Sequence, residues 1–236
     1  MSLLQKFKKT KIIVALDYTT RKDAMHLASM LDPSIFYLKI GKVMFTRFGV
    51  QLIEDLHKLK FKIFLDLKFH DIPNTVYLSV QAAADLGVWM LSVHLLGGIN
   101  MLQAAKFALL NFSKSTPMLI GITMLTSFCE RDLKNIGVEH SLRKQILLLA
   151  RLADECGLDG IVCPGTEAKN IKNVFGNNLK IITPGIRMNN LYPNDQSQII
   201  TPIIAKKIAI DYIVIGRPVT MSPKPIDELN SFYSML

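Results

Sequence analysis

The sequence predicts a single-domain α/β protein folded as a (β/α)8 barrel (TIM barrel) over residues 1–236. Eight short apolar runs recur about every 20 to 30 residues, and longer segments with helical periodicity separate them. Alternating strands and helices form parallel sheets, and eight such units need about 250 residues, close to the 236 present here. No linker or composition change marks a second domain. A doubly wound open sheet is the alternative, but no dinucleotide-binding fingerprint follows the first run.

The predicted strands are short runs of β-branched and other apolar residues, each bounded by polar residues, glycine or proline. Each run has the length of one barrel strand, so we expect eight strands in chain order. They cover residues 12–16, 35–40, 62–67, 88–94, 118–122, 160–163, 180–183 and 212–215.

The predicted helices lie between these strands. The first has Thr19 or Thr20 as its cap and an acidic residue in its first turn, and Ser141 caps a later one. The second repeats apolar residues at helical spacing. The helices cover residues 20–31, 43–59, 74–86, 100–112, 142–156, 168–175, opened by Thr166 and Glu167, and 196–208, with a short closing helix from Ile226.

The composition is that of a folded globular protein, with half of the residues hydrophobic and 20% charged. The net charge of +9 fits either nucleic acid or a small anionic substrate. The basic residues are spread along the chain rather than gathered in one run, but charge alone does not separate the two, and our expectation of no nucleic-acid partner depends on the motifs. No run approaches the roughly 20 apolar residues of a membrane span, and no signal peptide is recognisable. Three widely spaced cysteines suggest neither disulfides nor a zinc site. We therefore expect a cytoplasmic protein that binds no membrane.

One stretch, 64–76 (FLDLKFHDIPNTV), changes abruptly from apolar to charged. If the strand pleat continues, Asp66 and Lys68 share one face and Leu67 points the other way. Pro73 stops sheet pairing, which places Asp71 in the loop just beyond. An exposed ion-pair cluster is the simplest interpretation of such a group.

Charged residues also end the neighbouring strands, with Asp17 after the first and Lys39 in the second. Because the chemistry of this fold lies at the C-terminal ends of its strands, we expect Asp66 to lie between Lys39 and Lys68 at one rim of the barrel. Asp71 would reach in from the loop and complete a Lys–Asp–Lys–Asp row, and no metal is needed to balance its charges. On the opposite side, Gly216 and Arg217 follow the last strand, where phosphate commonly binds. Residues 184–187 follow the seventh strand, and the loop 188–195 after them could cover that phosphate.

These motifs together resemble one family. The stretch 64–76, ALD at 15–17, LKIG at 38–41, LTS at 125–127, TPGIR at 183–187, DQ at 195–196 and IGRP at 215–218 is similar to bacterial orotidine 5'-phosphate decarboxylases, in the expected order along nearly the whole chain. The D-x-K-x-x-D core alone also fits sugar-phosphate aldolases of the same barrel superfamily. The IPNT extension, the LTS motif and the pair of Gln196 and Arg217 favour the decarboxylases.

The resemblance implies conversion of orotidine 5'-monophosphate to UMP in pyrimidine biosynthesis, with no metal and no organic cofactor. It implies that Lys68 is the general acid that protonates C6 as carbon dioxide leaves. Asp66 and Asp71 would flank the departing carboxylate. Lys39 would hold Asp66 and touch the ribose, and Asp17 would bind ribose hydroxyls.

The resemblance also assigns the remaining substrate contacts and a partner. Thr126 and Ser127 would face the pyrimidine. The phosphate end would be contacted by Arg187, Gln196, Gly216 and Arg217, and Pro184, after the seventh strand, is a further substrate-binding residue. In this family Asp71, Ile72 and Thr75 reach the pocket of the other subunit, so a homodimer with shared active sites is implied. The rivals are a metal-dependent sugar-phosphate aldolase and a non-catalytic nucleic-acid-binding module.

Other conspicuous residues are interpreted as structural. His70 lies at a strand end, where a histidine often bonds to the backbone. His94 ends the fourth strand and could line the pocket, but we interpret it as a core residue or one that supports the pocket from behind. Trp89, the only tryptophan, and the eleven methionines are expected to pack. Cys163 has no evident base beside it in the sequence, which argues against a thiol nucleophile.

Overall fold

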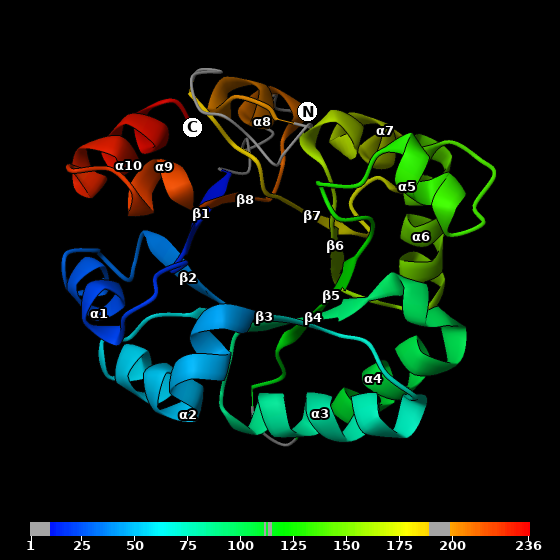
Figure 1. Cartoon of the computed structure of the whole chain (residues 1–236), viewed down its shortest axis with the longest axis horizontal. Coiled ribbons are helices and arrows are strands. Elements are labelled where there is room, and N and C mark those ends of the chain that lie inside the picture. Colours follow the sequence, from blue (N-terminus) through cyan, green and yellow to red (C-terminus); the bar gives the residue numbers. More distant parts are fainter. Residues whose placement is uncertain (1–9, 111, 113–114, 189–198) are drawn as a thin grey trace, which may run out of the picture.

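The computed structural model describes residues 10–110, 112, 115–188 and 199–236. Eight strands form one closed parallel barrel in chain order, and helices surround it (Figure 1). The strands are β1 (Lys11–Ala15), β2 (Phe36–Gly41), β3 (Ile63–Phe69), β4 (Met90–His94), β5 (Met118–Ile122), β6 (Gly160–Val162), β7 (Lys180–Thr183) and β8 (Tyr212–Ile215). The predicted fold class is confirmed, and the strand ends differ from the predicted ones by at most two residues.

Barrel closure depends on β1, which pairs with β2 on one side and with β8 on the other. Val14 lies opposite Leu38 of β2 and opposite Ile215 of β8. The first and last parts of the chain therefore share one wall, and the ends of β1 and β8 lie side by side.

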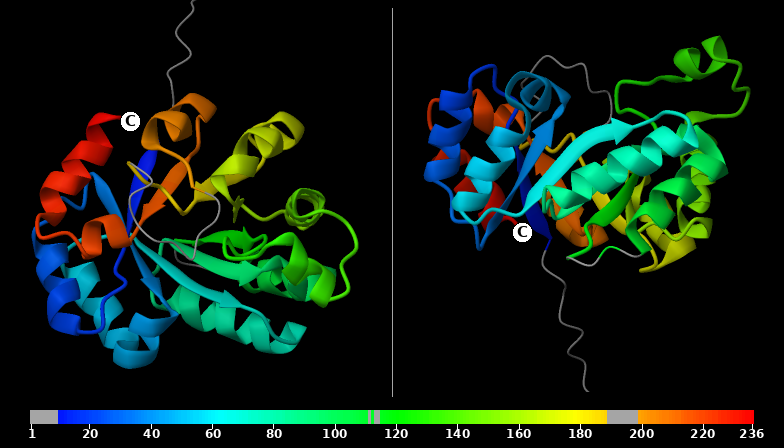
Figure 2. Two further views of the ribbon diagram at one scale, coloured as in Figure 1. Left: turned by 45° about the horizontal axis from the view of Figure 1, so that its top comes forward. Right: turned by 90° about the horizontal axis from the view of Figure 1, so that it is seen from below.

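The helices pack their apolar faces on the outside of the barrel (Figures 1 and 2). They are α1 (Arg21–Ser29), α2 (Lys42–Lys58), α3 (Pro73–Asp85), α4 (Gly98–Leu110), α6 (Leu142–Glu155), α7 (Gly165–Phe175), α8 (Pro202–Ile208) and α10 (Pro225–Ser234). Thr20 caps α1 through its side chain and Ser141 caps α6, both as predicted. Within the described residues, no helix is long and apolar enough to cross a membrane.

Three short elements escaped prediction, and one helix starts later than predicted. The additional elements are α5 (Glu130–Asn135), α9 (Arg217–Thr220) and the 3₁₀ turn η1 (Leu95–Gly97), each too short for a periodic apolar pattern. The predicted start of the 196–208 helix is wrong within the described part, because 199–201 are not helical. Thr201 accepts a hydrogen bond from the Ile204 N–H, and Pro202 fits the first helical position because it needs no hydrogen-bond acceptor.

The barrel interior is filled by side chains at every second position of the strands, as the pleat requires. At the N-terminal end this filling is aromatic. The rings of Tyr37 and Trp89 stack at 4.5 Å between centroids, and Tyr212 meets both edge-on at 6.1 and 5.3 Å. The interpretation of Trp89 as a packing residue is confirmed. The aromatic cluster closes this end of the barrel, and the polar residues that follow the strands lie at the opposite, C-terminal end.

Candidate active site

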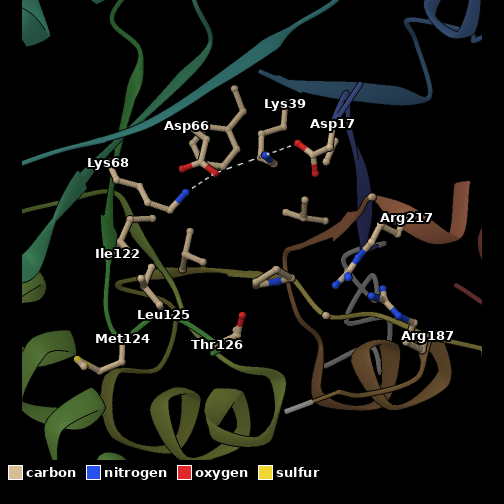
Figure 3. Close-up of a pocket in the computed structure, with 17 residues that line it drawn as sticks. Asp17, Lys39, Asp66, Lys68, Ile122, Met124, Leu125, Thr126, Arg187 and Arg217 are labelled. Atoms are coloured by element: carbon tan, nitrogen blue, oxygen red, sulfur yellow. Dashed lines mark hydrogen bonds and ion pairs between the residues drawn. The ribbon is translucent and has the colours of Figure 1, made fainter. Parts of the chain in front are cut away.

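A pocket opens at the C-terminal ends of the strands, where the fold predicts it (Figure 3). Nine of the residues singled out in the sequence line it: Asp17, Lys39, Asp66, Lys68, Thr126, Pro184, Arg187, Gly216 and Arg217. They come from both sequence-distant halves of the barrel. The structure therefore brings the lysine–aspartate row and the two arginines to one cavity.

The row of charges is continuous on one side of the pocket. Lys39 Nζ lies 3.5 Å from Asp17 Oδ1 and 3.6 Å from Asp66 Oδ2, and Lys68 Nζ lies 2.9 Å from the same Asp66 oxygen. The Lys39 and Asp66 side chains are only 12% and 10% exposed, whereas Asp17 is half exposed. This is a partly desolvated ion-pair network rather than a surface ion pair, so its members are held in fixed positions.

The ionisation of this row is set by burial and by its neighbours. Burial opposes the charged form of Asp66, but the ammonium groups of Lys39 and Lys68, with hydrogen bonds from Lys68 and Ser92, outweigh it and lower its pKa. Burial likewise opposes the charged form of Lys39, and the carboxylates of Asp66 and Asp17 outweigh it and raise its pKa. Asp66 and Lys39 are therefore both charged at neutral pH, as a buried ion pair.

Lys68 reaches its place through a break in strand regularity. Leu65 pairs with Leu91 of β4, but the next pair joins Phe69 to Val93, so three β3 residues face one residue of β4. Lys68 has φ of 52°, a left-handed conformation that costs a non-glycine residue roughly 1–2 kcal/mol. The two-residue pleat assumed from the sequence is thus interrupted by a β-bulge, although Lys68 and Asp66 still make contact.

The opposite side of the pocket carries two arginines, from the ends of β7 and β8 (Figure 3). The Arg187 side chain is anchored by a hydrogen bond of 2.9 Å from its Nη1 to the Ile186 carbonyl, and the residue is only 6% exposed. Arg217 is the first residue of α9. A methyl group built on Gly216 would come within 3.2 Å of Asp17 Oδ2, so a side chain there would crowd the pocket. Guanidinium groups beside a glycine are well suited to an anionic ligand.

An apolar wall between the two charged sides was missed in the sequence. It is formed by Ala15, Phe64, Ile122, Met124, Leu125, Val162, Gly185 and Val214. Several of these residues lie near the ends of their strands, two positions from a predicted site residue. Ala15 precedes Asp17 in this way, and Phe64 precedes Asp66. Strand alternation could have identified them, but as apolar residues they gave no chemical signal. The wall can exclude water from part of a bound ligand.

Four predicted site residues lie outside the pocket of a single chain: Asp71, Ile72, Thr75 and Ser127. Asp71 accepts a hydrogen bond of 2.7 Å from the Ile72 N–H, and both residues are exposed. The expectation that Asp71 extends the row within one chain is therefore not met. Gln196 and most of the loop 188–195 lie outside the described residues.

The two histidines at strand ends have a packing arrangement. Their rings stack at 5.3 Å between centroids, and His94 Nδ1 accepts the Leu96 N–H at 3.3 Å. Burial, together with the charges of His70, Lys68 and Lys42, lowers the pKa of His94 to about 4. His94 is therefore neutral at pH 7, and it binds the backbone outside the pocket lining, which fits its interpretation as a supporting residue.

Cys163 follows β6 and is fully buried. Burial, and then the Glu167 carboxylate, raise the pKa of its thiol to about 12, although the nearby Thr183 opposes this shift. The thiol stays protonated at neutral pH, so a nucleophilic role is not supported. Within the described part of the chain, no group of three or more His, Cys, Asp or Glu side chains is arranged to hold a metal ion.

Comparison with known proteins agrees with this site. A model of the Orotidine 5'-phosphate decarboxylase / HUMPS family matches residues 10–232. A protein of Buchnera aphidicola subsp. Schizaphis graminum named orotidine 5'-phosphate decarboxylase is 60% identical over 220 residues, 93% of each chain. One from Shewanella sediminis is 46% identical, covering 95% of this chain and 96% of its own.

A solved structure gives the same result. The crystal structure of orotidine 5'-phosphate decarboxylase from Lactobacillus acidophilus matches with a TM-score of 0.85 and 34% identity, over 96% of this chain and 99% of that one. The residues that the family model matches, 10–232, include all eight strands of the barrel. On these grounds the chain belongs to the orotidine 5'-phosphate decarboxylase / HUMPS family.

Proposed function

We propose that this chain decarboxylates orotidine 5'-monophosphate to UMP and carbon dioxide, in the cytoplasm, without a metal or an organic cofactor. The observation that carries the proposal is the position of the Lys39–Asp66–Lys68 row across one pocket from Arg187 and Arg217. The names of the relatives, which are orotidine 5'-phosphate decarboxylases, support the same activity.

Lys68 is proposed to carry the chemical step. When the bond between C6 and the carboxylate breaks, the electron pair stays on C6, and a fixed ammonium group nearby stabilises that charge. Lys68 then donates one proton to C6, which forms the C–H bond of UMP and leaves a neutral amine that regains a proton from solvent. Its 2.9 Å contact with Asp66 holds the ammonium group in position without a metal ion.

The phosphate is proposed to bind at the far side of the pocket. Arg187 and Arg217 provide planar donors for its oxygens, and Gly216 leaves room for close approach. Gln196 would add a contact from the loop after β7. Binding energy from the phosphate can then be used to hold the pyrimidine against Lys68.

The remaining substrate contacts follow from the same orientation. Asp17, half exposed at the rim beside Lys39, is proposed to accept hydrogen bonds from ribose hydroxyls. Thr126 and Pro184 line the pocket and would face the pyrimidine. Ser127, the residue after Thr126, is proposed to face it as well. The apolar wall would cover the ring and exclude water.

A homodimer with shared sites is proposed to complete the pocket. Ile72 is 67% exposed, and Leu78 of α3 and Phe107 of α4 are 55% and 59% exposed on neighbouring helices. Large exposed apolar side chains are enriched at protein interfaces, which supports the proposal. Asp71 and Thr75 belong to the same segment and would enter the partner's pocket.

The proposed activity is tested by following the ultraviolet absorbance of orotidine 5'-monophosphate with and without a chelator. We expect equal turnover in both. A purified, folded chain without turnover would contradict the activity. Activity lost on chelation and restored by a divalent metal would contradict the absence of a metal and favour the sugar-phosphate aldolase chemistry.

Site sharing is tested by mixing two inactive variants. Lys68→Ala and Asp71→Ala dimers that exchange subunits should recover roughly a quarter of the wild-type activity, because half of the dimers are hybrids with one intact site of two. Mass spectrometry of the mixture verifies exchange. No recovery after verified exchange would contradict sharing.

A further inference from the structure

Ser92 of β4 lies directly beside the lysine–aspartate row but does not line the pocket. It is fully buried, two residues after Met90 on the inward-facing side of its strand. Its hydroxyl group donates to Asp66 Oδ1 at 2.9 Å and accepts the Lys68 N–H at 2.9 Å. One side-chain oxygen therefore contacts both the backbone and the carboxylate that place the Lys68 side chain.

The position of Ser92 follows from the bulge in β3. Leu91 pairs with Leu65 and Val93 pairs with Phe69, so Ser92 alone faces the three residues between them. The regular ladder is interrupted there, and the Lys68 N–H finds its acceptor in the Ser92 side chain. Because Lys68 has φ of 52°, this hydrogen bond stabilises a backbone conformation that would otherwise relax.

The two oxygens of Asp66 have different partners. Oδ2 contacts the ammonium groups of Lys68 and Lys39, and Oδ1 accepts the hydrogen bond from Ser92. With both oxygens engaged, the plane of a carboxylate that is only 10% exposed is fixed. An alanine at position 92 would leave Oδ1 without this donor and the Lys68 N–H without this acceptor, and both are costly inside a protein.

We propose that Ser92 is a positioning residue for the decarboxylation: through one hydroxyl group it fixes the Lys68 backbone and the Asp66 carboxylate together, and so sets where the Lys68 ammonium group lies. The inference rests on the proposed function. Ser92 itself touches no substrate, and it acts on the rate of the chemical step rather than on binding.

The kinetic test compares Ser92→Ala with the conservative variant Ser92→Thr. We expect Ser92→Ala to lower kcat by roughly 10- to 100-fold, since misplacement of about 1 Å is enough for such a loss, and to change KM by less than about threefold. The acid limb of its rate profile should move to higher pH, because Asp66 loses one of the hydrogen bonds that lower its pKa. Ser92→Thr keeps the hydroxyl group and should recover most of kcat.

Thr10→Val is the matched control. Thr10 is also buried, and its hydroxyl group donates at 2.8 Å to the Ile210 carbonyl at the other end of the barrel. The Thr10→Val substitution therefore removes one buried hydroxyl group that does not contact the lysine–aspartate row. A loss of kcat in Ser92→Ala no larger than that in Thr10→Val, with an unmoved acid limb, would overturn the proposal.

A second readout does not depend on activity. The amide hydrogen of Lys68 should exchange with solvent roughly tenfold faster in Ser92→Ala than in the wild type and at the wild-type rate in Thr10→Val. An unchanged exchange rate of the Lys68 amide in Ser92→Ala would contradict the proposal that Ser92 holds the Lys68 backbone in place. A wild-type protein without turnover but with this exchange pattern would instead contradict the proposed function alone.

Discussion

The two ends of the barrel use the same strand positions for opposite purposes. On β2, Tyr37 and Lys39 are two residues apart and share the inward face, but Tyr37 belongs to the aromatic cluster and Lys39 to the charged row. At the N-terminal end, apolar rings in contact contribute stability. At the C-terminal end, buried charges and a left-handed lysine contribute little or cost stability, which is typical of functional sites. The comparison predicts that substitutions separate cleanly into two classes.

The largest expected effect is on turnover, at the C-terminal end. Lys68→Ala should lower kcat by at least about 10³-fold, because it removes the group proposed both to stabilise the charge on C6 and to donate the proton. Binding of UMP should be retained, and the free energy of unfolding should change by less than about 1 kcal/mol, since Lys39 and Ser92 still contact Asp66. Single-turnover kinetics and chemical denaturation measure the two quantities.

Lys62→Ala is the control for Lys68→Ala. Lys62 Nζ lies 5.9 Å from the centre of the Tyr37 ring at the opposite end of the barrel, so its removal should leave kcat unchanged. Wild-type turnover in Lys68→Ala would remove Lys68 from its proposed role.

The next largest effect is on stability, at the N-terminal end. Tyr212→Ala should lower the free energy of unfolding by about 3 kcal/mol, because it leaves a cavity beside Tyr37 and Trp89. The folded fraction should keep its kcat. Tyr212→Phe, which keeps the ring, should lose less than about 1 kcal/mol in urea denaturation. A large loss of kcat in the folded Tyr212→Ala protein would show that the two ends are coupled.

A smaller effect is expected on binding at the phosphate side. Arg217→Ala should weaken the binding of UMP by about 2 kcal/mol, roughly 30-fold in Kd, because it removes the proposed charge-assisted contact to the phosphate. Uridine, which lacks the phosphate, should lose less than twofold. Isothermal titration of both ligands provides the comparison, and equal losses for the two would contradict an anion site at Arg217.

The smallest expected effect is in the pH dependence of stability, in which the acid-sensitive groups lie at the C-terminal end. The folded-state pKa of His94 is lowered to about 4, mainly by burial, so the unfolded chain binds its proton first, and stability falls as pH decreases from 6.5 to 4. The lowered pKa of Asp66 adds a further loss at still lower pH. Urea denaturation from pH 4 to 7 measures this, and His94→Asn should flatten the upper part of the curve.

At the N-terminal end the sensitivity is to alkali. Burial raises the pKa of Tyr212 to about 12, so the unfolded chain releases this proton first, and stability falls as pH rises from 10 to 12. Tyr212→Phe removes this part of the loss, while the part that belongs to the raised pKa of Lys39 remains. An identical alkaline loss in Tyr212→Phe and the wild type would contradict the assignment.

Much of this architecture could be predicted from the sequence, because the signals were local. Apolar runs bounded by polar residues gave the strands, and barrel order then brought Asp17, Lys39 and Asp66 to one rim. Short elements such as α5 were invisible because six residues show no periodicity. The conformation of Lys68 was also hidden, since a bulge depends on the register of two strands rather than on one sequence.

Ser92 was missed for a different reason. A serine in an apolar run has no chemical signature, and only the neighbouring strand reveals that its hydroxyl group serves Asp66 and Lys68. Asp71 shows the complementary limit: its motif was recognisable, but in the single chain its side chain is exposed and lies outside the pocket.

The contact between β1 and β8 has a consequence for how the pocket arises during synthesis. Asp17 is made early and Gly216 almost last, yet they become neighbours when the barrel closes. A nascent chain that has completed its first four strands already carries Lys39, Asp66, Lys68 and Ser92 but still lacks Arg187 and Arg217. Truncated chains that end before β7 therefore contain only one side of the pocket. The pocket lining is complete only when β8 pairs with β1.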